Sequence, residues 1–287
     1  RSPESLLDEI EYLYKDFNVN FISFQDDLLM SSVSHTEEVC KEFLKRNLPV
    51  KWECNGRLNY CSEELLELMK SAGCVFINYG IESMDQKVLN NMKKGLRPEM
   101  IYQGIEDTLK VGISPGLNFI FGNKGDNKET LKKTVDFLLK YDDFAQKRTL
   151  RPVTPYPGSP LYYDAINQGL LDPNNPAEDF YEKKHLNSDL LCCNFTELTD
   201  DQFYSALSDA NKELMINYFD RQKESTVNQI EHLYKNKDVT FRGFRHNAGQ
   251  GMTGEKFNDK NKKIRNWESS PHQDADRFNK NDNDEIS

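Results

Sequence analysis

A regular alternation of short apolar runs with amphipathic helical patterns constrains the fold of this chain most strongly. Each run ends in polar residues, as in Phe21-Ile-Ser-Phe-Gln-Asp-Asp27, Trp52-Glu-Cys-Asn-Gly-Arg57, Val75-Phe-Ile-Asn-Tyr-Gly-Ile-Glu-Ser83 and Leu117-Asn-Phe-Ile-Phe-Gly122. Strand and helix units of this size predict a parallel sheet with right-handed crossovers. Polar groups at the carboxyl ends of parallel strands are where (β/α) barrels carry their chemistry, so the pattern predicts an enzyme site.

Cap residues and apolar spacing set the expected element boundaries. Ser2 and Pro3 begin a helix at the very start of the chain, so no strand precedes it, and Gly73 ends another helix. Helices are predicted over residues 2–17, 33–46, 62–72, 84–91, 98–111 and 128–141. Strands are predicted over residues 19–24, 50–55, 75–81, 117–121 and 146–153. The expected fold is therefore a parallel α/β barrel whose opening strand is absent.

The regular alternation of strand and helix patterns stops after Pro152. A rigid loop, Pro155-Tyr-Pro-Gly-Ser-Pro160, precedes a short helix at 161–169, a turn at 172–175 and a helical pattern at 199–234. That last pattern fits one long helix or two shorter ones. Residues after about 235 are rich in Asn, Lys, Asp and Gly, which predicts disorder. We expect a barrel unit at 1–169, a helical region at 170–234 and a disordered polar tail at 235–287.

Composition excludes several classes of partner. The 287 residues carry a net charge of −10, and the tail's charges roughly cancel, so the folded part is acidic. An acidic body argues against nucleic-acid binding, which needs a basic face. No apolar run approaches the ~20 residues that a membrane span needs. The six cysteines are dispersed without a Cys-x2-Cys pair, which predicts reduced thiols in a cytoplasmic protein.

Two strand ends carry candidate ligand-binding residues. Strand alternation places Glu53, Asn55 and Arg57 on one face, where three buried polar side chains would each need a partner. This favours a ligand site; an internal ion pair between Glu53 and Arg57 is the structural alternative. At the next strand end, Gly80 allows close approach of a ligand and Glu82 could accept its hydrogen bonds. The alternative there is a helix-capping Ser83 beside a solvated Glu82.

The other candidates are weaker when taken one at a time. Asp26 and Asp27 could bind a metal or cap a helix, and Asn118 with Gly122 resembles a nucleoside cradle. Arg151 and the Pro155–Pro160 loop could form a pocket wall or a rigid turn. The five histidines lack metal-ligand spacing, and the adjacent Cys192 and Cys193 do not favour chelation of one metal. No phosphate-binding or nucleophile-elbow motif is present.

Several segments, taken together, carry a family resemblance. They are Arg1-Ser-Pro-Glu-Ser5, Phe24-Gln-Asp-Asp27, Trp52-Glu-Cys-Asn-Gly-Arg57, Ala72-Gly-Cys74, Tyr79-Gly-Ile-Glu-Ser83, Val88-Leu-Asn-Asn-Met-Lys-Lys-Gly95, Phe121-Gly122 with Glu129-Thr130, and Pro155-Tyr-Pro-Gly-Ser-Pro-Leu161. In order and spacing they resemble the radical S-adenosylmethionine (radical SAM) superfamily, in its cobalamin-binding branch. The resemblance covers residues 1–169.

The resemblance implies a partial (β/α)6 TIM-type barrel that binds S-adenosylmethionine (SAM) beside a [4Fe–4S] cluster. It implies reductive cleavage of SAM to a 5′-deoxyadenosyl radical, with methyl transfer or rearrangement of a small-molecule substrate. An electron donor such as flavodoxin or ferredoxin is implied as partner, and cobalamin as a second cofactor. By similarity, Glu53 and Lys94 contact the methionine part of SAM, and Glu82 and Asn118 contact the ribose. The Gly122 region flanks the adenine, with Asn55 and Arg57 as companions.

The sequence departs from the family in one respect. The Cys-x3-Cys-x2-Cys loop that holds the cluster is absent, so no metal-ligating residue is assigned in this chain. In the family that loop lies shortly before the position at which this chain starts, so we expect it, and any cobalamin domain, upstream of Arg1. Two other hypotheses stay open. One is a non-catalytic remnant or scaffold barrel that no longer binds a cluster; the other is a barrel hydrolase or lyase with a metal at Asp26, Asp27 and Glu82.

Overall fold

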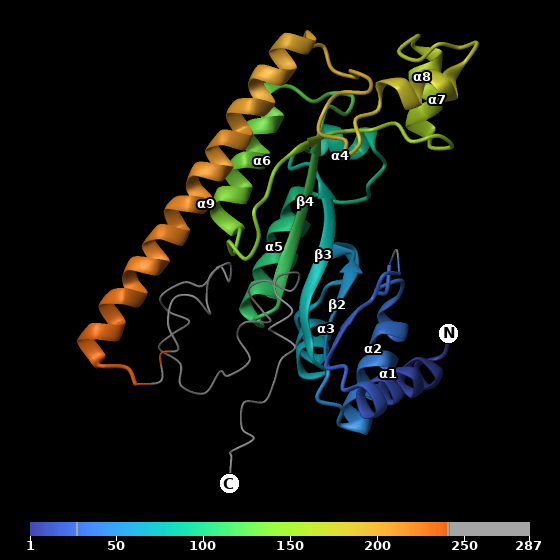
Figure 1. Cartoon of the computed structure of the whole chain (residues 1–287). Helices are drawn as coiled ribbons and strands as arrows, with labels where there is room; N and C mark the ends of the chain where they lie inside the picture. The colour runs from blue at the N-terminus through green and yellow to red at the C-terminus, as the bar shows by residue number, and fades with distance from the viewer. Residues whose placement is uncertain (27, 240, 242–287) are drawn as a thin grey trace.

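Five parallel strands form a curled sheet in the order β1-β2-β3-β4-β5 (Figure 1). The computed structural model describes residues 1–26, 28–239 and 241. The strands are β1 (Phe21–Ser23), β2 (Lys51–Gly56), β3 (Cys74–Glu82), β4 (Ser114–Phe121) and β5 (Arg151–Pro152). This half-barrel confirms the expected α/β, partial TIM-type fold. The absence of an opening strand concerns sequence before Arg1 and stays a prediction.

Helices connect the strands at the predicted places. They are α1 (Pro3–Phe17), α2 (Val33–Arg46), α3 (Glu63–Ser71), α4 (Gln86–Asn91), α5 (Pro98–Lys110) and α6 (Lys128–Tyr141), with a short 3-10 turn, η1 (Leu58–Tyr60). The predicted caps Ser2 and Ser62 are confirmed: their Oγ atoms accept hydrogen bonds from the backbone N–H groups of Ser5 and Leu65. The alternative in which Ser83 caps the next helix is wrong, because Asp85 caps α4.

The two edge strands are shorter than their apolar patterns predicted. β1 and β5 each have a single neighbouring strand, so fewer backbone groups can join the ladder. Just before β5 a side chain replaces the missing partner: Asn211 accepts a hydrogen bond from the backbone N–H of Leu150 at 2.7 Å and donates one to its carbonyl at 3.0 Å. The Asn211 side chain thus takes the place of a neighbouring strand for the backbone of Leu150, just before β5.

One face of the sheet is covered by helices and forms the main core. Trp52, Tyr79 and Phe119 point to this face; the Trp52 ring stacks on Phe43 of α2 with centroids 5.6 Å apart, and its Nε1 donates to the carbonyl of Ala72. Side chains alternate along a strand, so the intervening residues of β2, β3 and β4 lie on the opposite face. That second face carries the polar residues singled out in the sequence.

The carboxyl-terminal helices are α7 (Pro160–Asn167), α8 (Pro176–Lys183) and α9 (Asp200–Asn236). The pattern at 199–234 is one long helix, which packs alongside α6 (Figure 1), and α8 was not predicted. α9 continues to Asn236, so residues 235 and 236, which the sequence analysis assigned to the tail, are helical, and the disorder of the tail stays a prediction. Residues 240 and 242–287 lie outside the described residues. Within the described part of the chain, no helix is both long and apolar enough to cross a membrane.

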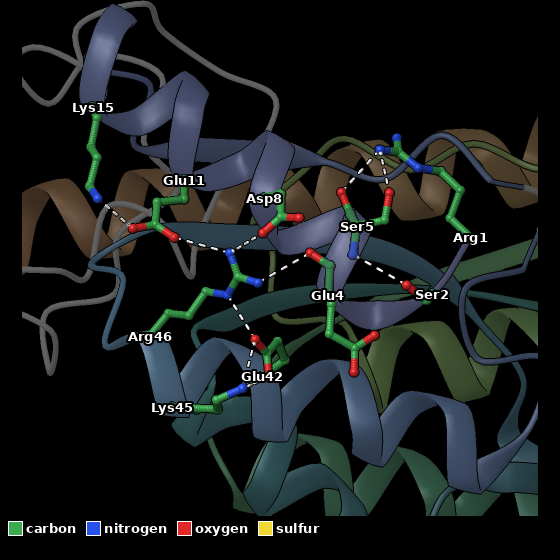
Figure 2. Close-up of polar contacts among 10 residues, drawn as sticks. All are labelled: Arg1, Ser2, Glu4, Ser5, Asp8, Glu11, Lys15, Glu42, Lys45 and Arg46. Carbon is green, nitrogen blue, oxygen red and sulfur yellow. Dashed lines mark hydrogen bonds and ion pairs between the residues drawn. The ribbon is translucent and has the colours of Figure 1, made fainter.

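Arg46 fastens the first helix to the second (Figure 2). Its Nη1 lies 2.8 Å from Oδ1 of Asp8 and 3.0 Å from Oε2 of Glu11, both on α1. Its Nε lies 2.8 Å from Oε1 of Glu42, and its Nη2 donates to the carbonyl of Glu4 at 3.2 Å. The side chain is 15% exposed, so these contacts are partly shielded from solvent. All three nitrogens of the Arg46 guanidinium are therefore engaged, and the group joins α1 to α2.

Candidate functional site

A row of polar side chains crosses the sheet face opposite the main core, near the carboxyl ends of the strands. We call it the helix-free face because, in the described part of the chain, α2, α3, α5 and α6 pack into the main core on the other side; only at its β5 end does Ile120 meet the cluster formed by α7 and α8. The parallel register pairs Ser23 with Glu53 and Asn55 with Asn78, and it pairs Gly80 with Asn118. Glu53 is 4% exposed, and its Oε1 accepts a hydrogen bond from the Oγ of Ser23 at 2.7 Å. These polar side chains lie outside the main core and do not contribute to its packing. Their position therefore fits a ligand site.

The amide groups of three strands are joined in this row. Asn78 Nδ2 donates to Asn55 Oδ1 at 3.0 Å, and Asn118 Nδ2 donates to Asn78 Oδ1 at 2.6 Å. Asn55 Nδ2 in turn donates to the backbone carbonyl of Asp26 at 2.9 Å. The predicted residues Asn55 and Asn118 are therefore brought together by Asn78, which was not predicted. Its signal was available, because Asn78 precedes Gly80 by two residues and shares its face.

Glu82 and Lys94 form an ion pair at the end of β3. Nζ of Lys94 lies 3.0 Å from Oε1 of Glu82, with the two side chains 29% and 21% exposed. Glu82 has a φ of 74°, and the register with β4 shifts between Gly80 and Glu82. The unusual backbone turns the Glu82 side chain back over Gly80, whose missing Cβ leaves it room. The structure thus joins two residues that the sequence analysis treated separately.

Gly122 lies apart from this group, at the buried end of β4. Its φ is 106°, and a Cβ there would meet the Phe203 ring of α9 at 3.0 Å. The carboxylate of Asp126 accepts the backbone N–H groups of Gly122 and Asn123 at 3.0 and 2.9 Å. Burial raises the pKa of the Asp126 carboxyl, although these hydrogen bonds oppose the shift. Gly122 shapes the turn under α9, and its place beside an adenine stays a prediction.

The remaining candidates differ in position. Arg57 follows β2 in an extended conformation, and its side chain is exposed. Asp26 contributes its backbone carbonyl to the amide row, whereas Asp27 lies outside the described residues. Among the residues that the structure describes, no three His, Cys, Asp or Glu side chains gather in a way that could hold a metal ion.

The thiols of this chain are not arranged for a cluster. All six cysteines lie in the described part of the chain, five of them buried and Cys61 half-buried. Burial raises the pKa of Cys61 to about 11 and also raises that of Cys40. Iron–sulfur clusters are held by thiolates, so buried thiols of high pKa are poor ligands. Cys192 and Cys193 are close, with Sγ atoms 4.0 Å apart, but they offer two sulfurs rather than three.

A pocket of about 470 Å³ opens at the β5 edge of the sheet. Its lining includes Ile120 and Arg151, which are register partners, and Thr154. Arg151 is half exposed, with Nε 3.3 Å from Oδ1 of Asp189. The Oγ1 of Thr154 is buried and has no hydrogen-bond partner among the described residues. Ile120 lies two residues after Asn118, so the pocket adjoins the polar row on the same face.

Comparison with known proteins relates part of this chain to a known family. Residues 1–138 match the radical SAM superfamily. An uncharacterized methyltransferase of Pyrococcus horikoshii is 28% identical over 171 residues, which cover 59% of this chain and 37% of the relative. The anaerobic magnesium-protoporphyrin IX monomethyl ester cyclase of Rubrivivax gelatinosus is 30% identical over 166 residues, covering 57% and 30%. The chain thus matches about a third of the length of these relatives.

A solved structure shares the fold. The radical SAM methyltransferase TsrM from Kitasatospora setae, with cobalamin and a [4Fe–4S] cluster bound, superposes with a TM-score of 0.50 at 20% identity. The likeness covers 58% of this chain and 32% of TsrM. The family match identifies residues 1–138, just under half of the chain, as a radical SAM domain, and the parallel arrangement of β1–β4 within these residues agrees with it.

Proposed function

We propose that the helix-free face binds SAM, and that the chain belongs to a cobalamin-type radical SAM enzyme that carries out methyl transfer or rearrangement on a small molecule. The single observation that supports this best is the polar row formed by Glu53, Asn55, Asn78 and Asn118, next to the Glu82–Lys94 pair. The solved relative TsrM, which binds cobalamin and a [4Fe–4S] cluster, supports the cofactor type.

The residues present fit the chemistry of SAM. Its amino acid part carries an ammonium and a carboxylate, which a carboxylate such as Glu53 and a cation such as Lys94 could contact. Its ribose carries hydroxyl groups, which Glu82 and Asn118 could bind as hydrogen-bond acceptors. Asn55 helps to hold this row in place through its bond to Asn78. These roles agree with those implied by the family resemblance.

The [4Fe–4S] cluster does not fit the thiols of this chain, because the six cysteines are dispersed and mostly buried. We therefore derive no step through it, and we assign no residue to cobalamin. A cluster held elsewhere in the full-length protein would supply the electron for homolytic cleavage of SAM. The task of this chain's own residues is to hold SAM in one orientation and to limit water at the reacting bond.

We further propose that the substrate occupies the pocket at the β5 edge. A volume of about 470 Å³ suits a small molecule, and the pocket lies next to the SAM face. Arg151 and the buried hydroxyl of Thr154 offer hydrogen-bond donors beside the apolar side chains of Ile120 and Val153. This combination favours a substrate that joins an apolar body to an acceptor group such as a carboxylate or phosphate.

Anaerobic reconstitution of the full-length protein with iron and sulfide tests the proposal. Reductive cleavage of SAM to 5′-deoxyadenosine is expected, and Glu82→Ala should reduce its rate by at least about tenfold. Arg151→Gln should leave this cleavage intact and reduce turnover of substrate alone. Binding of SAM by a protein that takes up no cluster and cleaves no SAM would favour the alternative, a non-catalytic barrel that no longer binds a cluster. Failure to bind SAM at all would overturn the proposal.

A further inference from the structure

The three asparagines of the polar row form a chain of hydrogen bonds with one direction. It begins at the backbone carbonyl of Asp26, which accepts from Asn55 Nδ2 at 2.9 Å. It continues from Asn78 Nδ2 to Asn55 Oδ1 at 3.0 Å, and ends with Asn118 Nδ2 donating to Asn78 Oδ1 at 2.6 Å. The chain therefore runs from the loop after β1 across β2 and β3 to β4.

The starting point fixes the orientation of every amide that follows. A backbone carbonyl can only accept, so Asn55 must turn its NH2 group toward Asp26 and its oxygen toward Asn78. Asn78 must then offer its NH2 group to Asn55, and its oxygen is left for Asn118. Rotating any one amide by half a turn would bring two oxygens or two NH2 groups face to face. The polarity of the row is thus dictated by Asp26.

The last amide of the row is the one that a ligand can reach. Asn118 is exposed, its Nδ2 is engaged by Asn78, and no donor in the described part of the chain bonds its Oδ1. The row therefore leaves a carbonyl-type oxygen as the free end of Asn118. Such an oxygen accepts hydrogen bonds, which matches the hydroxyl groups of a sugar and disfavours an acceptor-only group such as a carboxylate.

Gly116 of β4 makes room for this arrangement. It is the register partner of Asn78, and a Cβ at this position would lie 2.4 Å from Asn78 Oδ1 and 2.9 Å from Asn78 Cα. The second of these contacts is with backbone, which cannot move aside as a flexible side chain can. The absence of a side chain at Gly116 therefore lets the Asn78 amide lie across β4 and reach Asn118.

We propose that Asn78 is a positioning residue, which acts through Asn118 by fixing its Oδ1 as an acceptor for the ribose hydroxyls of SAM. This inference rests on the proposed function and deepens it, since it assigns the recognition of the sugar to the direction of a hydrogen-bond chain. Asn78 itself contacts no ligand in this account. Its role is to keep the Asn118 amide from rotating, so that the ribose meets an acceptor already in place.

Equilibrium binding to the full-length protein tests this role with two probes, SAM and its 2′,3′-dideoxy analogue. The wild type should bind SAM at least about tenfold more tightly than the analogue. Asn78→Ala should weaken SAM binding about fivefold to tenfold and barely affect the analogue, so that the preference for SAM falls to about twofold.

Two further variants separate positioning from general stability. Asn78→Asp keeps an acceptor opposite Asn118 Nδ2, but it sets a second oxygen against Asn55 Oδ1 and adds a negative charge. These two changes act on both probes alike, so the variant should retain most of the preference for SAM. Asn91→Ala is the matched control, because Asn91 Nδ2 also holds a backbone carbonyl, that of Lys124, but belongs to no row. It should change neither affinity.

The outcomes distinguish this inference from the proposed function. If the wild type binds SAM and Asn78→Ala keeps both its affinity and its preference over the analogue, the positioning role is wrong while SAM binding stands. If Asn78→Ala weakens both probes equally, Asn78 only supports the fold and the role is again wrong. If the wild type binds neither probe, the proposed function itself fails. The expected result is a loss of affinity confined to SAM in Asn78→Ala, with the preference for SAM over the analogue retained in Asn78→Asp.

Discussion

The Nζ of Lys94 lies 3.0 Å from Oε1 of Glu82, and the pair sits over the face of Gly80 that lacks a side chain. An added Cβ at Gly80 would lie 2.8 Å from that Glu82 oxygen and 3.3 Å from the Lys94 nitrogen. The close approach depends on the positive φ of Glu82, which turns the side chain back along its own strand. Chain conformation, rather than sequence spacing alone, thus brings these two charges to the polar row.

Gly80→Ala should impair SAM binding and leave the fold nearly unchanged. Its new methyl group would press on the ends of two flexible side chains, which can move at little cost. The Tm should therefore change by no more than about 2 °C. The displaced carboxylate would no longer face the ligand, so the Kd for SAM should rise about tenfold. Calorimetric titration and a thermal melt on one preparation measure both; a large fall in Tm with unchanged Kd would contradict this account.

Arg46→Ala should loosen the packing of α1 against α2. The substitution leaves the carboxylates of Asp8, Glu11 and Glu42 close together without the cation between them. We expect Tm to fall by about 3–6 °C. Lys45→Ala is the matched control, since Lys45 pairs with Glu42 from a side chain that is 71% exposed, and its removal should barely change Tm. Equal changes in Tm for the two variants would show that the Arg46 contacts stabilise the fold no more than the exposed pair of Lys45 and Glu42 does.

Asp126 should make part of the stability depend on pH. Burial raises its pKa in the folded state, so folding favours the protonated form. The stability that this group contributes is therefore present below the unfolded pKa of about 3.9 and is lost as pH rises through the raised folded value. Asp126→Asn lacks this titration and can still accept from the N–H groups of Gly122 and Asn123.

Urea unfolding of both proteins between pH 4 and pH 7 measures this effect. Relative to the wild type, Asp126→Asn should become more stable as pH rises and then reach a constant difference. A difference that stays flat over this range, or that falls with pH, would contradict the assignment of a raised pKa to Asp126.

Arg148 should be needed because it neutralises a buried carboxylate. Its Nε lies 2.7 Å from Oδ1 of Asp142, and both side chains are about 10% exposed. Burial raises the pKa of Asp142 even with Arg148 beside it. Arg148→Met should therefore lower the free energy of unfolding by about 3 kcal/mol. Adding Asp142→Asn should restore most of this loss in a double-mutant cycle; strict additivity of the two changes would show that the pair is not coupled.

The strand and helix pattern was predictable because apolar runs and cap residues act locally. β2 and β3 lie within one residue of their predicted bounds, and β4 ends where predicted but begins at Ser114, three residues earlier; each of the three is flanked by two neighbouring strands. The lengths of the edge strands β1 and β5 were overestimated, and for β5 the reason is a contact that the sequence does not show. The backbone before β5 is paired by Asn211 of α9, about sixty residues further along, and that contact forms only in the folded chain.

The candidate site was predictable residue by residue but not as an arrangement. Glu53, Asn55, Glu82 and Asn118 could be chosen because polar side chains at the ends of buried strands need an explanation. Their connection through Asn78 depends on the register between β2, β3 and β4, and the pairing of Glu82 with Lys94 depends on a positive φ. Neither is encoded in a local pattern, so both required the structure.

Calorimetric titration of the full-length protein with SAM tests the central claim most directly. The account predicts one SAM site per chain, with affinity reduced about tenfold by Glu82→Ala and by Asn118→Ala and unchanged by Asn91→Ala. Absence of SAM binding, or an affinity that neither of the first two substitutions alters, would show that the helix-free face of the sheet is not where SAM binds.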